Sequence, residues 1–590
     1  MKDHLQSLVR AALEPVLSGT GVAAPASITV DATKDAKFGD FATNVALALA
    51  KPLGKPPRAV AEAIIKALPP SARVAKAEIA GPGFINFFLA PGAFQAVVPE
   101  ILAAGAKFGC APKTRGKVMV EFVSANPTGP LHVGHGRGAA YGDSLSNILD
   151  AAGFEVYREY YINDAGRQAD LLAVSVWIRY LELLGERVPL PARAYPGDYI
   201  RATAAQLRAA HGDAFRQAAA AVVQGLAAEP QAPDDADEKT EAQVKGAQEE
   251  HADALIARAK ALLGARYATL QDFALADQLA VIRQTLDAFG VRFDNWVSER
   301  ALVQRGAVAH AVDRLKQAGL VFVQDGATWL RTTDYGDEKD RVLVKADGAA
   351  TYFCNDLAYH VDKLERGFPS LVNVWGADHH GYIARVKAAI EALTGRKDAL
   401  FVQMIQFVTL SSGRMGKRSG NFVTLADLID EAGRDETRFF YLLRGAEQHL
   451  EFDIELARSK TNDNPVYYVQ YACARIASVF RQAAERSVSF DAAAAAQRVA
   501  RLAEPHEKAL LTLLNRYPQL VQDAAREHAP QMVTHYLREV AEALHAYYNV
   551  HQFLVDDAEL RDARLALVAA TGQVLRNGLG LLGVSAPDKM

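Results

Sequence analysis

The chain has 590 residues, of which 50% are hydrophobic and 23% charged, and its formal net charge is -4. A chain of this length exceeds one hydrophobic core, so we expect about three or four domains. It has no run of about 18 uninterrupted apolar residues, which excludes an ordinary membrane-spanning helix. The net negative charge also gives no global argument for nucleic-acid binding, so any contact with RNA must be local.

The first 17 residues alternate charged and apolar side chains at helical spacing and lack the features of a secretory signal. Three scattered cysteines, Cys110, Cys354 and Cys473, cannot form a disulfide framework or a CxxC metal site. We interpret them as small buried apolar side chains. Both observations favour a cytoplasmic protein.

In chain order, residues 1–112 predict a small α+β domain, with helical periodicity over 38–68 and a turn and strand at 77–89. From Lys117 a strand, a helix and a second strand follow, the order typical of a parallel sheet. We expect this multidomain α/β pattern to form one catalytic domain over residues 113–462.

An Ala-rich, charged insertion at about 185–265 interrupts that domain, and we expect it to form solvated helices. The sheet pattern resumes near Val291, continues through 351–356 and 371–382, and ends by residue 425. Residues 463–590 show helical periodicity throughout and predict an all-α bundle.

The segment EFVSANPTGPLHVGHGRG, residues 121–138, places His132 and His135 three residues apart where a helix should begin. Helix N-terminal N–H groups and the helix dipole favour anions, so we expect this turn to hold nucleotide phosphates. Gly134 lies between the histidines, and Gly129 and Pro130 form the preceding bend, which would let a ligand approach closely. An isolated HxxH more often marks surface or metal-ligating histidines, and His379 and His380 are candidates to complete a zinc site.

A second segment, SSGRMGKRSGN at 411–421, is a Gly- and Ser-rich loop with three cations. Such a loop can close on a triphosphate as charge develops, and Lys417 is the candidate for stabilising that charge. Taken alone, the loop would be interpreted as an exposed basic turn.

The motifs HVGH and RMGKR resemble the HIGH and KMSKS signatures of class I aminoacyl-tRNA synthetases, whose nucleotide domain is Rossmann-like and split. More narrowly, six segments resemble arginyl-tRNA synthetases: 38–51, 79–89, 121–138, 351–360, 376–382 and 464–476. The resemblance covers nearly the whole chain and is weakest at 185–265. One departure is that Arg414 replaces the first lysine of KMSKS, and Gly416 and Arg418 replace its serines, whereas the second lysine remains as Lys417.

The resemblance implies attachment of L-arginine to tRNA(Arg) through an arginyl-adenylate, with ATP and Mg²⁺, no metal held by the protein, and a monomer. It implies that activation waits for bound tRNA. It assigns catalysis to His132, His135 and Lys417, and ATP binding to these three with Gly134, His379, His380, Arg414, Met415 and Arg418. It assigns arginine binding to Glu121, Asn126, Tyr352, Asp356 and Asp378.

An arginine pocket also has a direct chemical argument. Carboxylates in fork geometry hold a guanidinium best, and Glu121 and Asp356 are expected at the carboxyl edge of the sheet. Without the resemblance, Glu121 would be interpreted as an edge-strand salt-bridge partner and Asp356 as a helix N-cap.

Aromatic residues of the bundle offer a platform for RNA bases. Tyr467, Tyr468 and Tyr471 precede Arg475 on one predicted helix, with Tyr547, Tyr548 and Phe553 further on. Aromatic residues in helical bundles are more often core. By resemblance the bundle binds the anticodon, the extreme C-terminus contributes to that binding, and the N-terminal domain reaches the D-loop. The candidate tRNA contacts are Tyr467, Tyr471, Arg475 and the C-terminal Met590.

Three alternatives remain open at this point. One is a zinc-dependent hydrolase built from His132, His135, His379 and His380. Another is a non-catalytic tRNA-binding paralogue, and the third is a cysteinyl or glutamyl synthetase of the same class.

Overall fold

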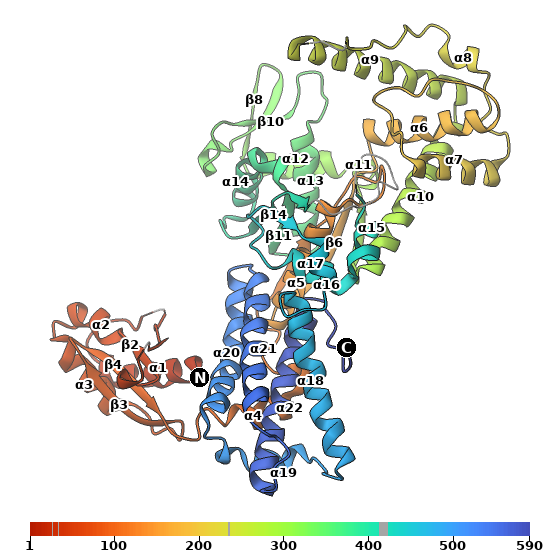
Figure 1. Ribbon diagram of the computed structural model, residues 1–590. Coiled ribbons are helices and arrows are strands. Elements are labelled where there is room, and N and C mark those ends of the chain that lie inside the picture. The colour runs from red at the N-terminus through yellow and green to blue at the C-terminus, as the bar shows by residue number, and fades with distance from the viewer. Residues whose placement is uncertain (26, 34, 234–236, 412–422) are drawn as a thin grey trace.

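The computed structural model describes residues 1–25, 27–33, 35–233, 237–411 and 423–590, with the backbone alone for residues 3, 36 and 378–380. Figure 1 shows an N-terminal domain beside a helical bundle, with a larger α/β domain at the end of the bundle. The predicted multidomain α/β architecture is confirmed.

The N-terminal domain is an antiparallel sheet of order β1-β2-β4-β3 covered by helices. Its elements are α1 (Lys2–Leu17), β1 (Asp31–Ala32), β2 (Phe41–Thr43), α2 (Val45–Leu53), α3 (Pro57–Ala67), β3 (Val74–Ala80) and β4 (Phe84–Leu89). Apolar residues of all three helices share one core, which ends at Ala93. Residues 1–93 therefore form the α+β unit that the sequence predicts.

Helix α4 (Val97–Ala104) packs with the helical bundle instead. Val97, Val98 and Ile101 lie in the same hydrophobic core as the bundle helices. The Gln95 amide donates to the Leu502 carbonyl at 3.0 Å. Residues 97–108 thus contact the bundle, whereas the sequence predicts an N-terminal domain that extends to residue 112.

A five-stranded parallel sheet of order β12-β11-β5-β6-β7 forms the centre of the catalytic domain. Its strands are β5 (Lys117–Glu121), β6 (Glu155–Ile162), β7 (Asn295–Ser298), β11 (Ser370–Gly376) and β12 (Leu400–Ile405). Two strands precede the insertion and three follow it. The prediction of one sheet built from two separated halves is confirmed.

Both faces of this sheet are covered. Along β5, Val118 and Val120 face the core that contains α5 (Val133–Ala151), whereas Met119 faces the core of α12 (Ala307–Gln317), α13 (Tyr352–Glu365) and α14 (Ile383–Thr394). This alternation is the period of two expected of a strand.

The strand expected at 351–356 is wrong. Thr351 caps helix α13, and its hydroxyl accepts the N–H of Cys354 at 3.2 Å. Phe353, Leu357 and Val361 are buried at helical spacing on one face. Strand pairing just upstream is instead a small antiparallel sheet of β8 (Val321–Gln324), β9 (Ala327–Leu330) and β10 (Arg341–Val344).

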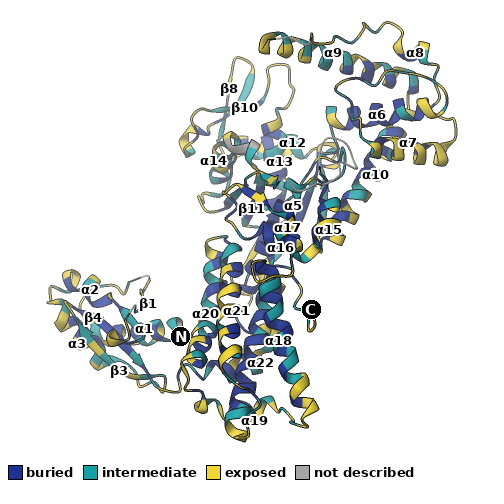
Figure 2. Ribbon diagram, viewed as in Figure 1, coloured by how far each residue is buried: buried dark blue, intermediate teal, exposed yellow. Residues whose placement is uncertain are grey.

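The insertion belongs to a helical unit with its own core. Its helices are α6 (Arg167–Leu183), α7 (Asp198–His211), α8 (Ala219–Val223), α9 (Glu238–Leu263) and α10 (Arg266–Ala288). Trp177 is fully buried and donates its indole N–H to the Phe215 carbonyl at 2.8 Å. The prediction of solvated helices therefore describes only part of this unit. Exposed residues dominate the first half of α9 (Figure 2), but the unit has an apolar interior.

The C-terminal bundle consists of α18 (Pro465–Glu485), α19 (Ala492–Ala496), α20 (Pro505–Arg526), α21 (Gln531–Val550) and α22 (Ala558–Leu581), which confirms the prediction for this region. The connecting elements are α11 (Glu299–Gln304), β13 (Val408–Leu410), α15 (Leu425–Ala432), α16 (Arg434–Tyr441), β14 (Leu450–Phe452) and α17 (Ile454–Arg458). The bundle and the sheet share one hydrophobic core.

Buried Arg438 joins the bundle to the catalytic domain. Its guanidinium pairs with Asp143 of α5 at 2.5 Å and donates to the Leu582 carbonyl at 2.8 Å. It also donates to the Phe289 carbonyl at 3.0 Å.

Two further findings concern membrane-spanning helices and thiols. Every helix among the described residues is too short or too polar to cross a bilayer. All three cysteines are free, and Cys354 and Cys473 are buried as predicted. The thiol of Cys110 is exposed, so the interpretation as a buried side chain is wrong there.

Candidate active site

His132 and His135 cap helix α5 reciprocally. The Nδ1 of His132 accepts the N–H groups of Gly134 at 3.0 Å and His135 at 3.3 Å, and the Nδ1 of His135 accepts the His132 N–H at 3.2 Å. Burial lowers the pKa of His132 and lowers that of His135 to about 3. Both rings are therefore neutral at pH 7, and each carries its proton on Nε2.

The free N–H groups expected in this turn are not available. Gly134 and His135 donate to the His132 ring, and Val133 donates to the Val423 carbonyl at 3.3 Å. The space beside Gly134 is also taken, because a Cβ there would lie 2.9 Å from Cε1 of His132. The donors that this turn offers a phosphate are the two imidazole Nε2–H groups.

The turn after β5 is strained. Val123 and Ser124 adopt positive φ angles of 67° and 40°, which non-glycine residues rarely do. The Ser124 hydroxyl donates to Glu121 Oε1 at 3.1 Å and accepts the Tyr161 N–H at 3.1 Å. These bonds hold the chain in this conformation, beyond which Asn126 is exposed.

Three carboxylates, Glu121, Glu299 and Asp356, gather around Tyr161, and we call them the acid pocket. Burial and the charges of all three raise the pKa of Tyr161. Burial, with the charge of Glu121, raises the pKa of Asp356 to about 7, and burial raises the pKa of Glu299. Buried Asp356 Oδ2 has no hydrogen-bond partner among the described residues. The acid pocket is thus short of positive charge.

One buried cation faces the acid pocket. The Lys363 side chain has 0% exposure, and its ammonium pairs with Glu121 Oε2 at 2.5 Å and donates to Asn373 Oδ1 at 3.3 Å. Glu121 is therefore a salt-bridge partner, but on the central strand of the sheet rather than on an edge strand. In the described part of the chain, this single ammonium leaves the other two carboxylates without a cation.

Several predicted residues follow strand ends at the same edge of the sheet. Glu121 ends β5, and the 3-10 helix Ala377–Tyr382, which contains Asp378, His379 and His380, follows β11. Ligands of parallel sheets bind at this carboxyl edge. Asp356 lies instead on the second turn of α13, where Thr351 is the N-cap. Tyr352 lies one turn before it and is 86% exposed.

Arg414, Met415, Lys417 and Arg418 lie outside the described residues. Residues 423–425 are anchored at the histidine turn. Thr424 forms a β-bridge with His132, and Leu425 donates to the Leu131 carbonyl at 2.7 Å. Lys417 lies six positions before Val423, a span of at most about 22 Å for a fully extended chain.

A metal site finds no support within the described part of the chain, where no three His, Cys, Asp or Glu side chains are grouped to hold an ion. This observation does not reach His379 and His380, whose side chains are not described.

The bundle aromatics divide into two groups. Tyr547 and Phe553 are buried core residues. Tyr467 and Tyr471 stack with ring centroids 5.9 Å apart and are half-buried. The Arg475 guanidinium lies 4.7 Å from the ring centroids of both Tyr471 and Tyr548. Met590 is 55% exposed.

Sequence reasoning missed Glu299, Ser124 and Lys363. Glu299 directly follows strand β7, the kind of position that Glu121 holds at the end of β5, so the rule that ligands bind at strand ends was a usable signal. Lys363 had no such signal, because a lysine within an amphipathic helix is normally exposed.

The split parallel sheet, the paired histidines at its carboxyl edge and the helical bundle define a class I aminoacyl-tRNA synthetase. The family model "tRNA synthetases class I (R), catalytic domain" matches residues 97–190 and 266–442. The models "Arginyl tRNA synthetase N terminal domain" and "DALR anticodon binding domain" match residues 3–89 and 469–590. The catalytic match skips 191–265, most of the predicted insertion.

Curated relatives and solved structures agree with this division. The arginine--tRNA ligases of Thioalkalivibrio sulfidiphilus and Azoarcus sp. are each 50% identical to the chain, with coverage of 100% of this chain and 100% and 99% of theirs. The Thermus thermophilus arginyl-tRNA synthetase structure superposes with a TM-score of 0.75 at 25% identity and 100% coverage of both chains. A Campylobacter jejuni structure described as a putative arginyl-tRNA synthetase gives 0.71 at 31% identity, covering 85% of this chain and 100% of that one. The chain belongs to the arginyl-tRNA synthetase family.

Proposed function

We propose that the protein attaches L-arginine to tRNA(Arg). Arginine and ATP form arginyl-adenylate and pyrophosphate, and the arginyl group then passes to the terminal ribose hydroxyl of the tRNA with release of AMP. The observation that carries this proposal is the acid pocket, in which Glu121, Glu299 and Asp356 face one buried cation, Lys363. A guanidinium supplies the missing charge and has five donors to share among the carboxylates.

The same chemistry gives specificity for arginine. Lysine would lose the bidentate geometry, and citrulline would lose the charge. Leaving a buried carboxylate unpaired costs about 3 to 5 kcal/mol, which is enough for strong discrimination. The residues proposed to bind arginine are Glu121, Asn126, Tyr352, Asp356 and Asp378, with Glu299 added from the structure.

In the activation step, the neutral rings of His132 and His135 donate Nε2–H to the phosphate oxygens on which charge builds as pyrophosphate leaves. Because these donors are preorganised by the helix cap, they need no rearrangement during the reaction. Mg²⁺ accompanies ATP as part of the substrate. The other proposed ATP contacts are Gly134, His379, His380, Arg414, Met415, Lys417 and Arg418.

The tRNA is proposed to contact all three regions, 1–112, 113–462 and 463–590. Tyr467, Tyr471 and Arg475 form a half-buried aromatic and cationic surface suited to unpaired bases, and exposed Met590 is a further proposed contact. We place the protein in the cytoplasm as a monomer whose activation step requires bound tRNA.

The direct test is aminoacylation of total tRNA with each of the twenty amino acids in turn. Arginine alone should be incorporated, in an ATP-dependent reaction. Incorporation of cysteine or glutamate would identify another member of the class, and tRNA binding without charging would identify a non-catalytic paralogue. Hydrolytic activity that needs stoichiometric zinc and no ATP would favour the hydrolase.

A further inference from the structure

A local basic segment precedes the catalytic sheet. Between Lys107 and Lys117 the sequence KFGCAPKTRGK contains four cations and no acidic residue, although the whole chain has a net charge of -4. Lys107, Lys113, Arg115 and Lys117 are all exposed, and of these Lys113 pairs with Asp150 at 2.5 Å. A basic surface of this kind is the electrostatic feature by which proteins hold a nucleic-acid backbone.

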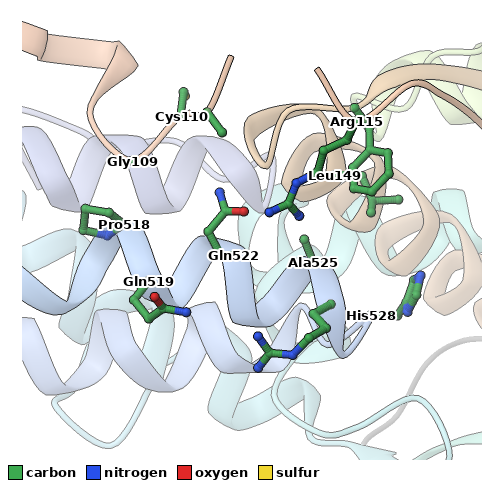
Figure 3. Close-up of a pocket in the computed structure, with 12 residues that line it drawn as sticks. Gly109, Cys110, Arg115, Leu149, Pro518, Gln519, Gln522, Ala525 and His528 are labelled. Carbon is green, nitrogen blue, oxygen red and sulfur yellow. The ribbon is translucent and has the colours of Figure 1, made fainter. Parts of the chain in front are cut away.

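A pocket of about 700 Å³ lies between this basic segment, the end of α5 and helix α20. Figure 3 shows Arg115 and Gln522 extending into it from opposite sides, one from the loop before β5 and the other from α20. Leu149 and Phe154 supply apolar lining, and Arg526 also lines the pocket. The pocket thus joins the catalytic domain to the bundle.

Among the described residues, two polar groups in this pocket lack a partner of opposite polarity or charge. The Gln522 Oε1 atom is buried and accepts no hydrogen bond from any described residue. The Arg115 guanidinium has no carboxylate partner within the described part of the chain, and lies 5.6 Å from the Phe154 ring centroid. Arg526 differs, because it pairs with Asp523 at 2.7 Å and Glu527 at 3.1 Å. A fitting ligand therefore carries an anion for Arg115 and a hydrogen-bond donor for Gln522.

We propose that this pocket and the basic segment bind the ribose–phosphate backbone of the tRNA, with a phosphate on Arg115 and a ribose 2′-hydroxyl on Gln522 Oε1. RNA carries these two groups side by side along its backbone. The inference rests on the proposed function, because it assigns a contact to the same tRNA. A tRNA that reaches both the catalytic domain and the bundle passes the joint between them, where the pocket lies.

Helix α20 also extends this surface toward the N-terminal domain. A second pocket of about 320 Å³ shares Pro518 and Gln519 with the first and is lined on its other side by Phe41 and Phe94. In Figure 1, α20 is the bundle helix nearest the N-terminal domain. The first pocket lies at the amino-terminal ends of β5 and β6, away from the histidine turn. Substitutions in this pocket should therefore weaken RNA binding and leave the chemistry intact.

The test is the affinity of the full-length protein for an arginine tRNA transcript over a series of salt concentrations, measured by fluorescence anisotropy. Each phosphate contact contributes about 1 to the slope of log Kd against log salt concentration. Arg115→Gln should weaken binding about tenfold, as expected for a hydrogen bond to a charged group, and lower the slope by about 1. Gln522→Leu should weaken binding with an unchanged slope.

Arg208→Gln is the matched control. Arg208 is an exposed arginine of α7, in the helical unit that contains the insertion, and the substitution removes the same charge. Its slope should equal that of the wild type. Charging at saturating tRNA should be normal for Arg115→Gln, with only the KM for tRNA raised.

An unchanged slope for Arg115→Gln, or an equal change in Arg208→Gln, would overturn the inference. A second outcome would also overturn the inference. If Arg115→Gln abolishes binding of AMP or inorganic phosphate but does not change the salt slope for tRNA, the pocket binds a small anion. Failure of the proposed function would appear differently, as a wild-type protein that does not charge tRNA with arginine.

Discussion

His132 and His135 each accept the backbone N–H of the other residue, and their rings stack with centroids 3.6 Å apart. The arrangement fixes the tautomer of both rings, because Nδ1 is occupied as an acceptor. It also keeps them uncharged, since burial lowers the pKa of each. The pair is therefore a rigid set of two neutral donors rather than two cations.

The first prediction separates the cap from the phosphate contact. Asparagine can replace His135 as the acceptor that caps the helix, but it lacks the outer donor. His135→Asn should lower the rate of arginyl-adenylate formation about 100- to 1000-fold, the usual effect of losing one preorganised donor. Its stability should fall by less than that of His135→Ala, which loses the hydrogen bond from the His132 N–H, worth about 1 kcal/mol. Pyrophosphate exchange with tRNA present and denaturant unfolding measure the two effects, and equal activity for His135→Asn and wild type would contradict the proposed role.

The second prediction concerns pH. In the free protein the pKa of Asp356 is about 7, and a bound guanidinium favours its ionised form. Arginine binding below about pH 7 should therefore release a proton, and the KM for arginine should fall as pH rises from 6 to 8. The effect of pH on folding stability has the opposite sign. Folding raises the pKa of Asp356 from 3.8 to about 7, so the stability that this group contributes is fully present below pH 3.8 and is lost as the pH rises through 7.

Calorimetric titration with arginine, in buffers of different ionisation enthalpy and with tRNA present, measures the released proton. Asp356→Ala should abolish arginine charging while the affinity for tRNA stays nearly normal. Unchanged charging by this variant would remove Asp356 from the arginine site.

The third prediction tests Glu299. Replacing it by Gln removes one charge from the acid pocket and one charge-assisted hydrogen bond to the substrate, worth about 1.5 to 3 kcal/mol. The KM for arginine should rise about 10- to 100-fold, whereas the KM for ATP should not change. Glu238→Gln, at the exposed start of α9, is the control and should match the wild type. A selective rise in the KM for ATP would place Glu299 outside the arginine pocket.

The fourth prediction concerns the buried pair of Lys363 and Glu121. Lys363→Met leaves the Glu121 carboxylate without its cation, which should lower the free energy of unfolding by about 3 to 5 kcal/mol. The double variant Lys363→Met/Glu121→Gln should regain most of that stability but not arginine charging. Urea denaturation measures both, and a double variant as unstable as the single one would show that packing, not charge, explains the loss.

Much of the fold could be predicted from local patterns. The strand, histidine turn and helix at 117–151 were recognisable because hydrophobic periodicity changes there from strand to helix. The prediction of a strand at 351–356 was wrong because Tyr, Phe and Thr favour strands. The Thr351 cap and the tertiary packing of Phe353, Leu357 and Val361 stabilise a helix there instead. The apolar interior of the insertion was hidden because its helices are Ala-rich and strongly charged on their outer faces.

The site was harder to predict than the fold. The chemistry of arginine binding pointed to Glu121 and Asp356. That these two carboxylates and Glu299 all lie around Tyr161 depends on elements that are distant in sequence. Residue patterns also cannot show that helix N–H groups are already bonded, so free backbone donors were expected where His132 occupies them.

The continuous core between sheet and bundle, which buried Arg438 also bridges, has a mechanical consequence. Within the described residues, close-packed side chains set the separation between the histidine turn and the aromatic surface of the bundle. We therefore expect the nucleic acid to change shape when the complex forms, while this part of the protein keeps its dimensions.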